Sequence, residues 1–366
     1  MHTPLVARCV RGLESALAAE VLRSPGTAVT GLGHREVRLL TTGSVPAPRT
    51  ADDVFLHAAR CPDIGRARAG LPALTGLVTA TDPGAPLALR RTATGSPAPT
   101  GIDVSASFLG HRAFNRYDIE DTVGEALSRH LGLPYHSRRT GVPAPPDHWG
   151  WRVTLDGTHA ALMLRGGGRP LHRRDYRRIT VPGALHPPVA AAMAALADPA
   201  PGALVLDPCC GAGTLLAESA LREPAARHLG FDLSGRALTA ARANTEGLPV
   251  TVERADAARL PLADGTVDRV LCNPPWGGQV PALGGLAGAP ERWWRELRRV
   301  LAPDGTAVLL LPGAGELTGA LAAGLVPAHV QRIRVSGAEA FMVRLDPVRR
   351  PSARPSRASG RSRPRR

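Results

Sequence analysis

The feature that most restricts the fold is a regular alternation of short apolar runs and helical patterns after residue 200. Apolar runs at 203–207, 228–232, 250–253, 268–272 and 306–311 are separated by helical patterns that begin near 214, 234 and 291. Parallel strands need a crossover connection, and a helix usually supplies it. The alternation therefore predicts an α/β domain over 184–346 with a Rossmann-like, mostly parallel, doubly wound sheet.

The first predicted strand of this domain runs into a glycine-containing turn. Ala203–Asp207 is followed by Pro-Cys-Cys-Gly211-Ala-Gly213, and a helical pattern starts at Thr214. Glycines let a ligand approach the backbone there, and the first N–H groups of the helix face it. The third glycine of the dinucleotide pattern G-x-G-x-x-G is missing, so a nicotinamide oxidoreductase is an alternative that the turn matches less well.

Carboxylates stand at the ends of the next two strands. Asp232 ends the second strand, where a carboxylate can accept both hydroxyls of a ribose. Asp256 follows the third strand and could accept from an adenine amino group, with a helix cap as the alternative role. Together they predict a cofactor that contains a nucleoside. The residues assigned to it are Asp207, Cys209, Gly211, Gly213, Thr214, Asp232, Leu233, Asp256, Ala257 and Asn273.

The fourth strand is followed by Asn273-Pro274-Pro275-Trp276, which we predict to be the catalytic segment. Ligands of open α/β sheets bind at the carboxyl ends of the strands, so this segment should face the glycine turn. An exocyclic base amine is a poor nucleophile, and the oxygens of Asn273 and Pro274 could accept hydrogen bonds from its two protons. The nitrogen could then attack a sulfonium methyl group without a strong general base. Trp276 would stack on the base, with a hydrophobic plug as its alternative role.

The region before residue 166 has a different, mixed pattern. A strand at 5–10, a helix at 13–22 and an alternation at 36–40 predict a small α+β domain over 1–60. A helix from about Asp52, a strand at 103–108, a helix at 119–131 and a hairpin closed at Asp156-Gly157 are predicted to follow, mostly within a second domain over 61–165. Residues 166–183 form a basic linker, and residues 347–366 form a disordered, arginine-rich tail.

All 45 basic residues are arginine, against 31 acidic ones, which favours a polyanionic partner. In the linker, Arg173, Arg174 and Arg177 are predicted to bind phosphate, with an exposed linker face as the alternative. The five cysteines form no C-x-x-C pair and indicate neither a disulfide framework nor a metal site. We find no signal peptide or membrane-spanning pattern, so a cytoplasmic location without membrane contact is expected.

Three segments resemble motifs of the THUMP-containing RNA methyltransferases. Residues 207–218 (DPCCGAGTLLAE) are similar to the family's D-P-F-C-G-S-G-T-x-x-x-E motif, residues 273–276 to its [ND]-P-P-[YFW] tetrad, and residues 171–177 (LHRRDYR) to its linker. Residues 105–120 also look like a THUMP strand and helix entry, which places Arg112 and Arg116 in RNA contact. The resemblance spans residues 1–346 and implies a ferredoxin-like and THUMP region before a class I methyltransferase domain.

The resemblance further implies that S-adenosylmethionine is the cofactor and that the substrate is guanine N2 of tRNA, methylated by a monomeric enzyme. Two departures leave the base and its position open. Trp276 replaces the commoner Tyr or Phe, and residues 277–280 (GGQV) lack the basic residue that often follows. Methylation of guanine N2 in rRNA, methylation of adenine N6 in RNA or DNA, and an inactive RNA-binding protein with a methyltransferase fold remain alternatives.

Overall fold

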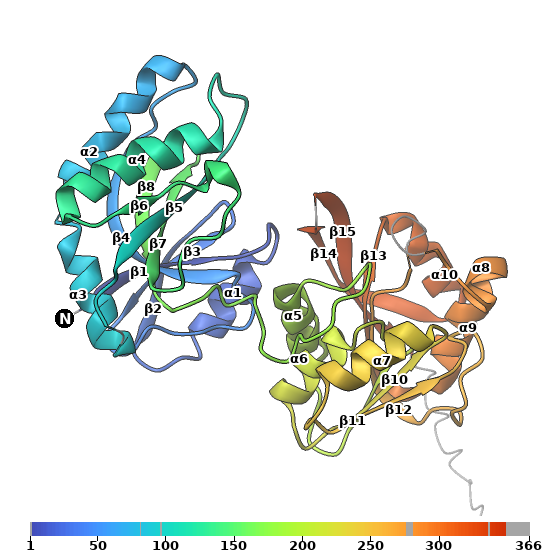
Figure 1. Cartoon of the computed structure of the whole chain (residues 1–366). Helices are drawn as coiled ribbons and strands as arrows, with labels where there is room; N and C mark the ends of the chain where they lie inside the picture. Colours follow the sequence, from blue (N-terminus) through green and yellow to red (C-terminus); the bar gives the residue numbers. More distant parts are fainter. Residues whose placement is uncertain (1, 81, 96, 276–280, 336, 349–366) are drawn as a thin grey trace, which may run out of the picture.

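The computed structural model describes residues 2–80, 82–95, 97–275, 281–335 and 337–348. Two sheets lie in separate halves of the molecule, an eight-stranded sheet before residue 166 and a seven-stranded sheet after residue 203 (Figure 1). Trp276 and residues 277–280 and 349–366 lie outside the described residues, so the predictions made for them stay predictions. No helix in the described part of the chain combines the length and apolar character needed to cross a bilayer.

The first sheet has the strand order β2-β3-β1-β4-β8-β7-β5-β6. Its strands are β1 Thr3–Arg8, β2 Thr27–Gly33, β3 Glu36–Thr41, β4 Asp53–Pro62, β5 Gly101–Phe108, β6 Tyr135–His136, β7 His148–Leu155 and β8 His159–Arg165. The helices of this half are α1 Glu14–Val21, η1 Arg68–Leu74, α2 Thr75–Thr79, α3 Gly84–Thr94, α4 Arg116–Leu131 and η2 Arg138–Thr140. The β7–β8 hairpin predicted at Asp156-Gly157 is confirmed.

The helix predicted from Asp52 is wrong, because these residues form strand β4. Val54, Phe55 and Leu56 are all buried, since β4 lies between β1 and β8 and both of its faces are covered. A continuous apolar run of this kind shows no strand alternation, so a buried strand and a buried helix look alike in the sequence. Residue 60, where we placed a domain boundary, lies inside β4, and one continuous sheet spans both sides of it.

Helix α4 shows how local sequence sets an element. Asn115 accepts hydrogen bonds from the backbone N–H groups of Tyr117 and Asp118, and the Asp118 carboxylate accepts one from the N–H of Asn115. This reciprocal capping box satisfies donors that have no partner within the helix. Gly132, with φ of +66°, ends the helix in the left-handed region that glycine tolerates best.

The second sheet has the order β11-β10-β9-β12-β13-β15-β14, with β9 to β13 parallel and β14 and β15 antiparallel. The doubly wound prediction is thus confirmed. The strands are β9 Leu204–Asp207, β10 Arg227–Asp232, β11 Val250–Arg254, β12 Val267–Cys272, β13 Leu301–Leu311, β14 Leu325–Val335 and β15 Ala338–Pro347. The helices are α5 Pro187–Ala197, α6 Thr214–Arg222, α7 Gly235–Asn244, α8 Gly285–Gly288, α9 Pro290–Val300, η3 Ala314–Glu316 and α10 Leu317–Ala322.

The strand order places one switch point at the centre of this sheet. From β9 the chain winds outward through β10 and β11, and it then returns to β12 on the other side of β9. Ligands of doubly wound sheets bind where the winding reverses, at the carboxyl ends of the strands. The turn after β9 and the segment after β12, which the sequence singled out, therefore lie on either side of this point.

Candidate active site

The turn after β9 has the geometry of a ligand cradle. Gly211 and Gly213 have φ of +52° and +76°, in the region where other residues are strained. A Cβ on Gly213 would press on Ala241 and Thr245 of the α7 end at 3.2–3.3 Å, so this glycine lets α6 and α7 approach each other. A Cβ on Gly211 would meet nothing within 4 Å. Gly211 therefore borders open space at the switch point.

The carboxylate of Asp232 is fixed beside this turn. One oxygen accepts a hydrogen bond from the N–H of Gly211 at 2.9 Å, and the other accepts one from the N–H of Ser234 at 2.8 Å. A carboxylate offers about four acceptor positions. The two remaining acceptor positions of Asp232 are available to the hydroxyls of a ribose, because the side chain is only half-buried.

Asp207 is buried at the end of β9, with 1% of its surface exposed. Burial raises the pKa of its carboxyl to about 8, the nearby charge of Asp232 also raises it, and the N–H of Cys209 opposes the shift by donating a hydrogen bond at 3.1 Å. The carboxyl is therefore largely protonated at neutral pH. Because the Asp207 carboxyl accepts the hydrogen bond from the N–H of Cys209, it helps to fix the backbone of the glycine turn.

Asp256 and Leu233 lie together on the β10–β11 side of the switch point. The Asp256 carboxylate accepts hydrogen bonds from the N–H groups of Ala258 and Gly285, both at 2.9 Å. A Cβ on Gly284 would lie 2.8 Å from Leu233 Cδ1, so the start of α8 rests against these two residues. The alternative role of Asp256 as a helix cap is matched in part, because its carboxylate accepts from the first N–H of α8, and its contact with adenine stays a prediction. Ala257 is buried next to Asp256, and Thr214 is buried at the start of α6, directly after the glycine turn.

Residues 273–275, the described part of the predicted catalytic segment, follow β12 next to the glycine turn. Residues of β12 pair with β9, Val270 opposite Leu206, so Asn273 emerges beside the turn that follows Asp207. Cys272 contacts Cys209 through their thiols, and burial raises the pKa of the Cys272 thiol. Asn273 is half-buried, and its side chain makes no hydrogen bond to any described residue.

Two of the five arginines predicted to bind RNA are engaged in buried contacts instead, and we correct both. Arg112 forms a two-pronged ion pair with Asp63 at 2.6 and 2.7 Å, and its side chain is only 3% exposed. Arg174 donates to Glu218 at 2.9 Å and is 9% exposed. The terminal nitrogens of Arg112 are engaged by Asp63 and the carbonyl of Gly65, and its unpartnered Nε is buried, so phosphate cannot reach it. Arg174 is likewise turned into the interior by its contact with Glu218.

The other three predicted arginines remain candidates. Arg173 is exposed and has no side-chain partner among the described residues. Arg116 is exposed on α4, where its guanidinium stacks 4.6 Å from the ring centre of Tyr117. Arg177 is half-buried, and its Nε has no hydrogen-bond partner.

Glu218 and Asn244, which were assigned no role from the sequence, connect the second half of the molecule to the linker, and Glu218 also connects it to the first half. Glu218 of α6, with no exposed side-chain surface, accepts hydrogen bonds from Arg49 at 2.6 Å, Arg174 at 2.9 Å and Tyr176 at 2.8 Å. Asn244 accepts from the N–H groups of residues 178 and 179 and donates to the carbonyl of Ala212 in the glycine turn. The only sequence signal for Glu218 was its place in the family motif.

Histidines of the linker also serve this junction. The Nε2 of His186 lies 2.6 Å from a carboxylate oxygen of Asp52, and the Nδ1 of His172 lies 3.1 Å from the Asp52 backbone carbonyl. Burial alone would raise the pKa of Asp52, but its hydrogen bond with His186 and the His186 charge outweigh that effect and lower it. Both histidines are therefore structural in this arrangement.

Comparisons with known proteins identify relatives of this chain. The chain matches the family model described as RMKL-like, methyltransferase domain, over residues 174–338. It is 35% identical to a tRNA (guanine(6)-N2)-methyltransferase of Thermus thermophilus over 262 residues, which cover 68% of this chain and 75% of that protein. It is 37% identical to the U6 snRNA (guanine-N(2))-methyltransferase THUMPD2 of Bos taurus over 53% of this chain and 37% of that protein. The crystal structure of TrmN from Thermus thermophilus matches with a TM-score of 0.72 and 28% identity, over 95% of this chain and 100% of that one.

Proposed function

Because this chain belongs to the THUMP-containing family of S-adenosylmethionine-dependent RNA guanine-N2 methyltransferases, we propose that it methylates N2 of a guanine in tRNA. The observation that carries this proposal is the half-buried Asn273 beside the glycine turn at the switch point, whose amide has no hydrogen-bond partner among the described residues. The Thermus thermophilus relative is named for guanine 6 of tRNA, and it aligns with two thirds of this chain. The THUMPD2 relative is named for a guanine in U6 snRNA, so guanine N2 is common to both.

The residues around the turn fit S-adenosylmethionine. The open space at Gly211 admits a ligand against the backbone, and the free acceptor positions of Asp232 suit its ribose. Cys209, Gly213 and Thr214 complete the turn, while Leu233, Asp256 and Ala257 would line the adenine side. When bound, S-adenosylmethionine supplies an electrophilic methyl carbon on a positively charged sulfur. Burial raises the pKa of Asp207 to about 8, which disfavours a negative charge beneath the turn.

Asn273 and Pro274 hold and orient the base amine. The Asn273 side-chain oxygen accepts one N–H of the amine, and the Pro274 carbonyl accepts the other, so the nitrogen lone pair is freed from the ring and directed at the methyl carbon. Pro274 and Pro275 restrict the backbone of this segment, which keeps the carbonyl in place. The new N–C bond would replace the bond between the methyl carbon and sulfur, whose electron pair would stay on the sulfur of the leaving S-adenosylhomocysteine, and one amine proton would pass to solvent. Trp276 is proposed to stack on the base.

The test is methyl transfer by an Asn273→Ala variant. We expect its kcat to fall by about 10²- to 10³-fold, the loss typical of removing one preorganised polar contact in an active site. Its affinity for S-adenosylmethionine, measured by calorimetry, should stay within about threefold of wild type, because Asp232 and the turn are unchanged. Asn273→Asp keeps an acceptor oxygen and should retain more activity than the alanine variant. Full activity of Asn273→Ala would refute the mechanism.

The substrate itself is tested by mass spectrometry of nucleosides. tRNA, rRNA and small nuclear RNA transcripts are incubated with wild-type protein and S-adenosylmethionine, then digested. N2-methylguanosine in tRNA alone is the expected product. N6-methyladenosine, or a product only in rRNA, would replace the proposed substrate with one of the alternatives.

A further inference from the structure

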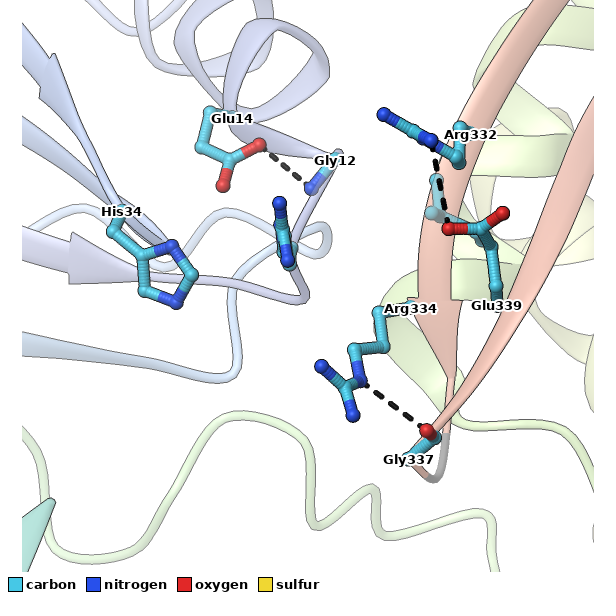
Figure 2. A pocket seen from close by; sticks show the side chains of 9 residues that line it. Gly12, Glu14, His34, Arg332, Arg334, Gly337 and Glu339 are labelled. Carbon is cyan, nitrogen blue, oxygen red and sulfur yellow. Dashed lines mark hydrogen bonds and ion pairs between the residues drawn. The ribbon is translucent and has the colours of Figure 1, made fainter. Parts of the chain in front are cut away.

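A cavity lies between the two halves of the molecule, away from the glycine turn. Its volume is about 480 Å³. One wall comes from the start of α1 and the β2–β3 turn, and the other from the β14–β15 hairpin (Figure 2). The two walls touch directly, because the N–H of Arg334 donates to the carbonyl of Arg11 at 3.0 Å and Gln331 donates to the carbonyl of Gly12.

The strand registers place this cavity at the catalytic edge of the second sheet. Cys272, the residue before the catalytic segment, pairs with Leu309 of β13. Two residues further along β13, Leu311 pairs with Phe341, which pairs with Arg332 of β14. The hairpin therefore extends past the carboxyl ends of the parallel strands, at the level of the residues that follow Cys272. Three strand spacings separate β12 from β14, which amounts to about 14 Å.

The cavity carries more positive than negative charge. Three arginines line it, namely Arg11, Arg332 and Arg334. Arg11 makes no side-chain hydrogen bond or ion pair with any described residue, and the one such bond of the Arg334 guanidinium within the described part of the chain goes from Nε to the carbonyl of Gly337 at 3.2 Å. Figure 2 labels Arg332 and Arg334 on the β14–β15 hairpin, beside the opening between the two walls. These donors are available to a ligand.

The two carboxylates of the cavity leave an excess of one positive charge, and within the described residues neither of them is hydrogen-bonded to Arg11 or Arg334. Both oxygens of Glu14 are occupied by backbone N–H groups, those of Gly12 at 2.7 Å and Arg35 at 3.0 Å. Glu339 pairs with Arg332 at 3.7 Å, and both side chains are more than half exposed, so this pair is weak. Burial and the charge of Arg11 lower the pKa of His34, so its imidazole is neutral at pH 7 and adds a polar contact without charge.

We infer that this cavity binds the sugar-phosphate backbone of the RNA substrate on one side of the target base, an inference that rests on the proposed function. Guanidinium groups match phosphate oxygens in geometry and charge, and uncompensated arginines attract a polyanion. One strand of a double helix carries a phosphate about every 3.4 Å, so ~14 Å spans roughly four stacked nucleotides. The cavity is thus within reach of an RNA strand whose base occupies the catalytic segment.

The test compares RNA binding by wild type, an Arg11→Ala/Arg334→Ala double variant and an Arg227→Ala control. Arg227 is exposed at the first residue of β10, so it lies at the opposite, amino-terminal edge of the same sheet. Affinity for a fluorescent tRNA transcript is measured by anisotropy from 0.05 to about 0.5 M KCl. Each phosphate contact contributes about 0.7–0.9 to the slope of log K against log salt.

For the double variant we expect the slope to fall by about 1.5 and the affinity at 0.1 M salt to fall by about 30-fold. The control should behave as wild type, and all three proteins should bind S-adenosylmethionine equally. A variant with Arg334→Lys in place of Arg334→Ala keeps the positive charge and should recover part of the lost RNA affinity. If the double variant kept the affinity and the slope of wild type, or if the control lost as much affinity as the double variant, this inference would be overturned while the proposed function would stand. A wild-type protein that methylates no RNA would overturn the proposed function, and this inference with it.

Discussion

The buried carboxylate of Glu218 offers a quantitative test of how the two halves are held together. Glu218→Gln keeps the size of the side chain but removes its charge and replaces one acceptor oxygen with a donor amide. Of the two arginines it pairs with, Arg174 is 9% exposed and Arg49 is 36% exposed. Arg49 can regain water, whereas Arg174 would be left as a buried charge without a carboxylate.

The expected loss follows from that difference in exposure. Breaking a buried ion pair by removing one partner costs about 3–5 kcal/mol. Because only Arg174 is deeply buried, we expect the lower end, about 3 kcal/mol. With a urea m-value of about 3 kcal/mol/M, the unfolding midpoint should fall by about 1 M. Tryptophan fluorescence and far-UV circular dichroism would both report the midpoint.

The matched control is Glu246→Gln. Glu246 also pairs with a linker arginine, Arg178, but the two side chains are 68% and 57% exposed. Such surface pairs contribute about 0–1 kcal/mol, so its midpoint should hardly change. The reasoning is refuted if Glu218→Gln shifts the midpoint no more than Glu246→Gln does.

Two further predictions concern pH and a close backbone contact. The pKa of Asp207 is raised to about 8 in the folded protein, against an ordinary value of 3.8. Between these two pH values the folded protein holds a proton that the unfolded chain has released. The contribution of this proton to stability is therefore full below about pH 4 and is lost as the pH rises through about 8. Urea midpoints of wild type relative to Asp207→Asn should therefore decline between pH 5 and 9, and a difference independent of pH would contradict the assigned pKa. Gly12→Ala should lower the stability of the protein more than Gly157→Ala, although both glycines have positive φ (+96° and +91°). A Cβ on Gly12 would overlap the Arg332 carbonyl and lie 2.9 Å from Ile333 Cα. A Cβ on Gly157 would meet no described atom within 4 Å. Thermal unfolding and limited proteolysis of the linker would measure this, and equal effects of the two substitutions would show that the contact is unimportant.

The sequence by itself determined the second half of the molecule and the position of its candidate site. The alternation of strands and helices, the glycines at 211 and 213 and the acids at 207 and 232 are local patterns. In a parallel sheet, local order along the chain also fixes which strand ends share an edge, so the sequence alone places Asn273 beside the turn. The same locality explains why the sequence predicts the hairpin at Asp156-Gly157 and the helix at 119–131, which begins three residues earlier in the structure, at Arg116.

Only the tertiary structure decided which charged side chains are free. Arg112 meets Asp63, 49 positions away, and Arg174 meets Glu218, 44 positions away, and no local pattern distinguishes them from the exposed Arg173. The strand β4 was taken for a helix because burial on both faces removes the alternation that identifies a strand. The basic cavity joins residues more than 300 positions apart, Arg11 and Arg334. Burial and ion pairing depend on such distant partners, so they are properties of the packed chain and not of any segment.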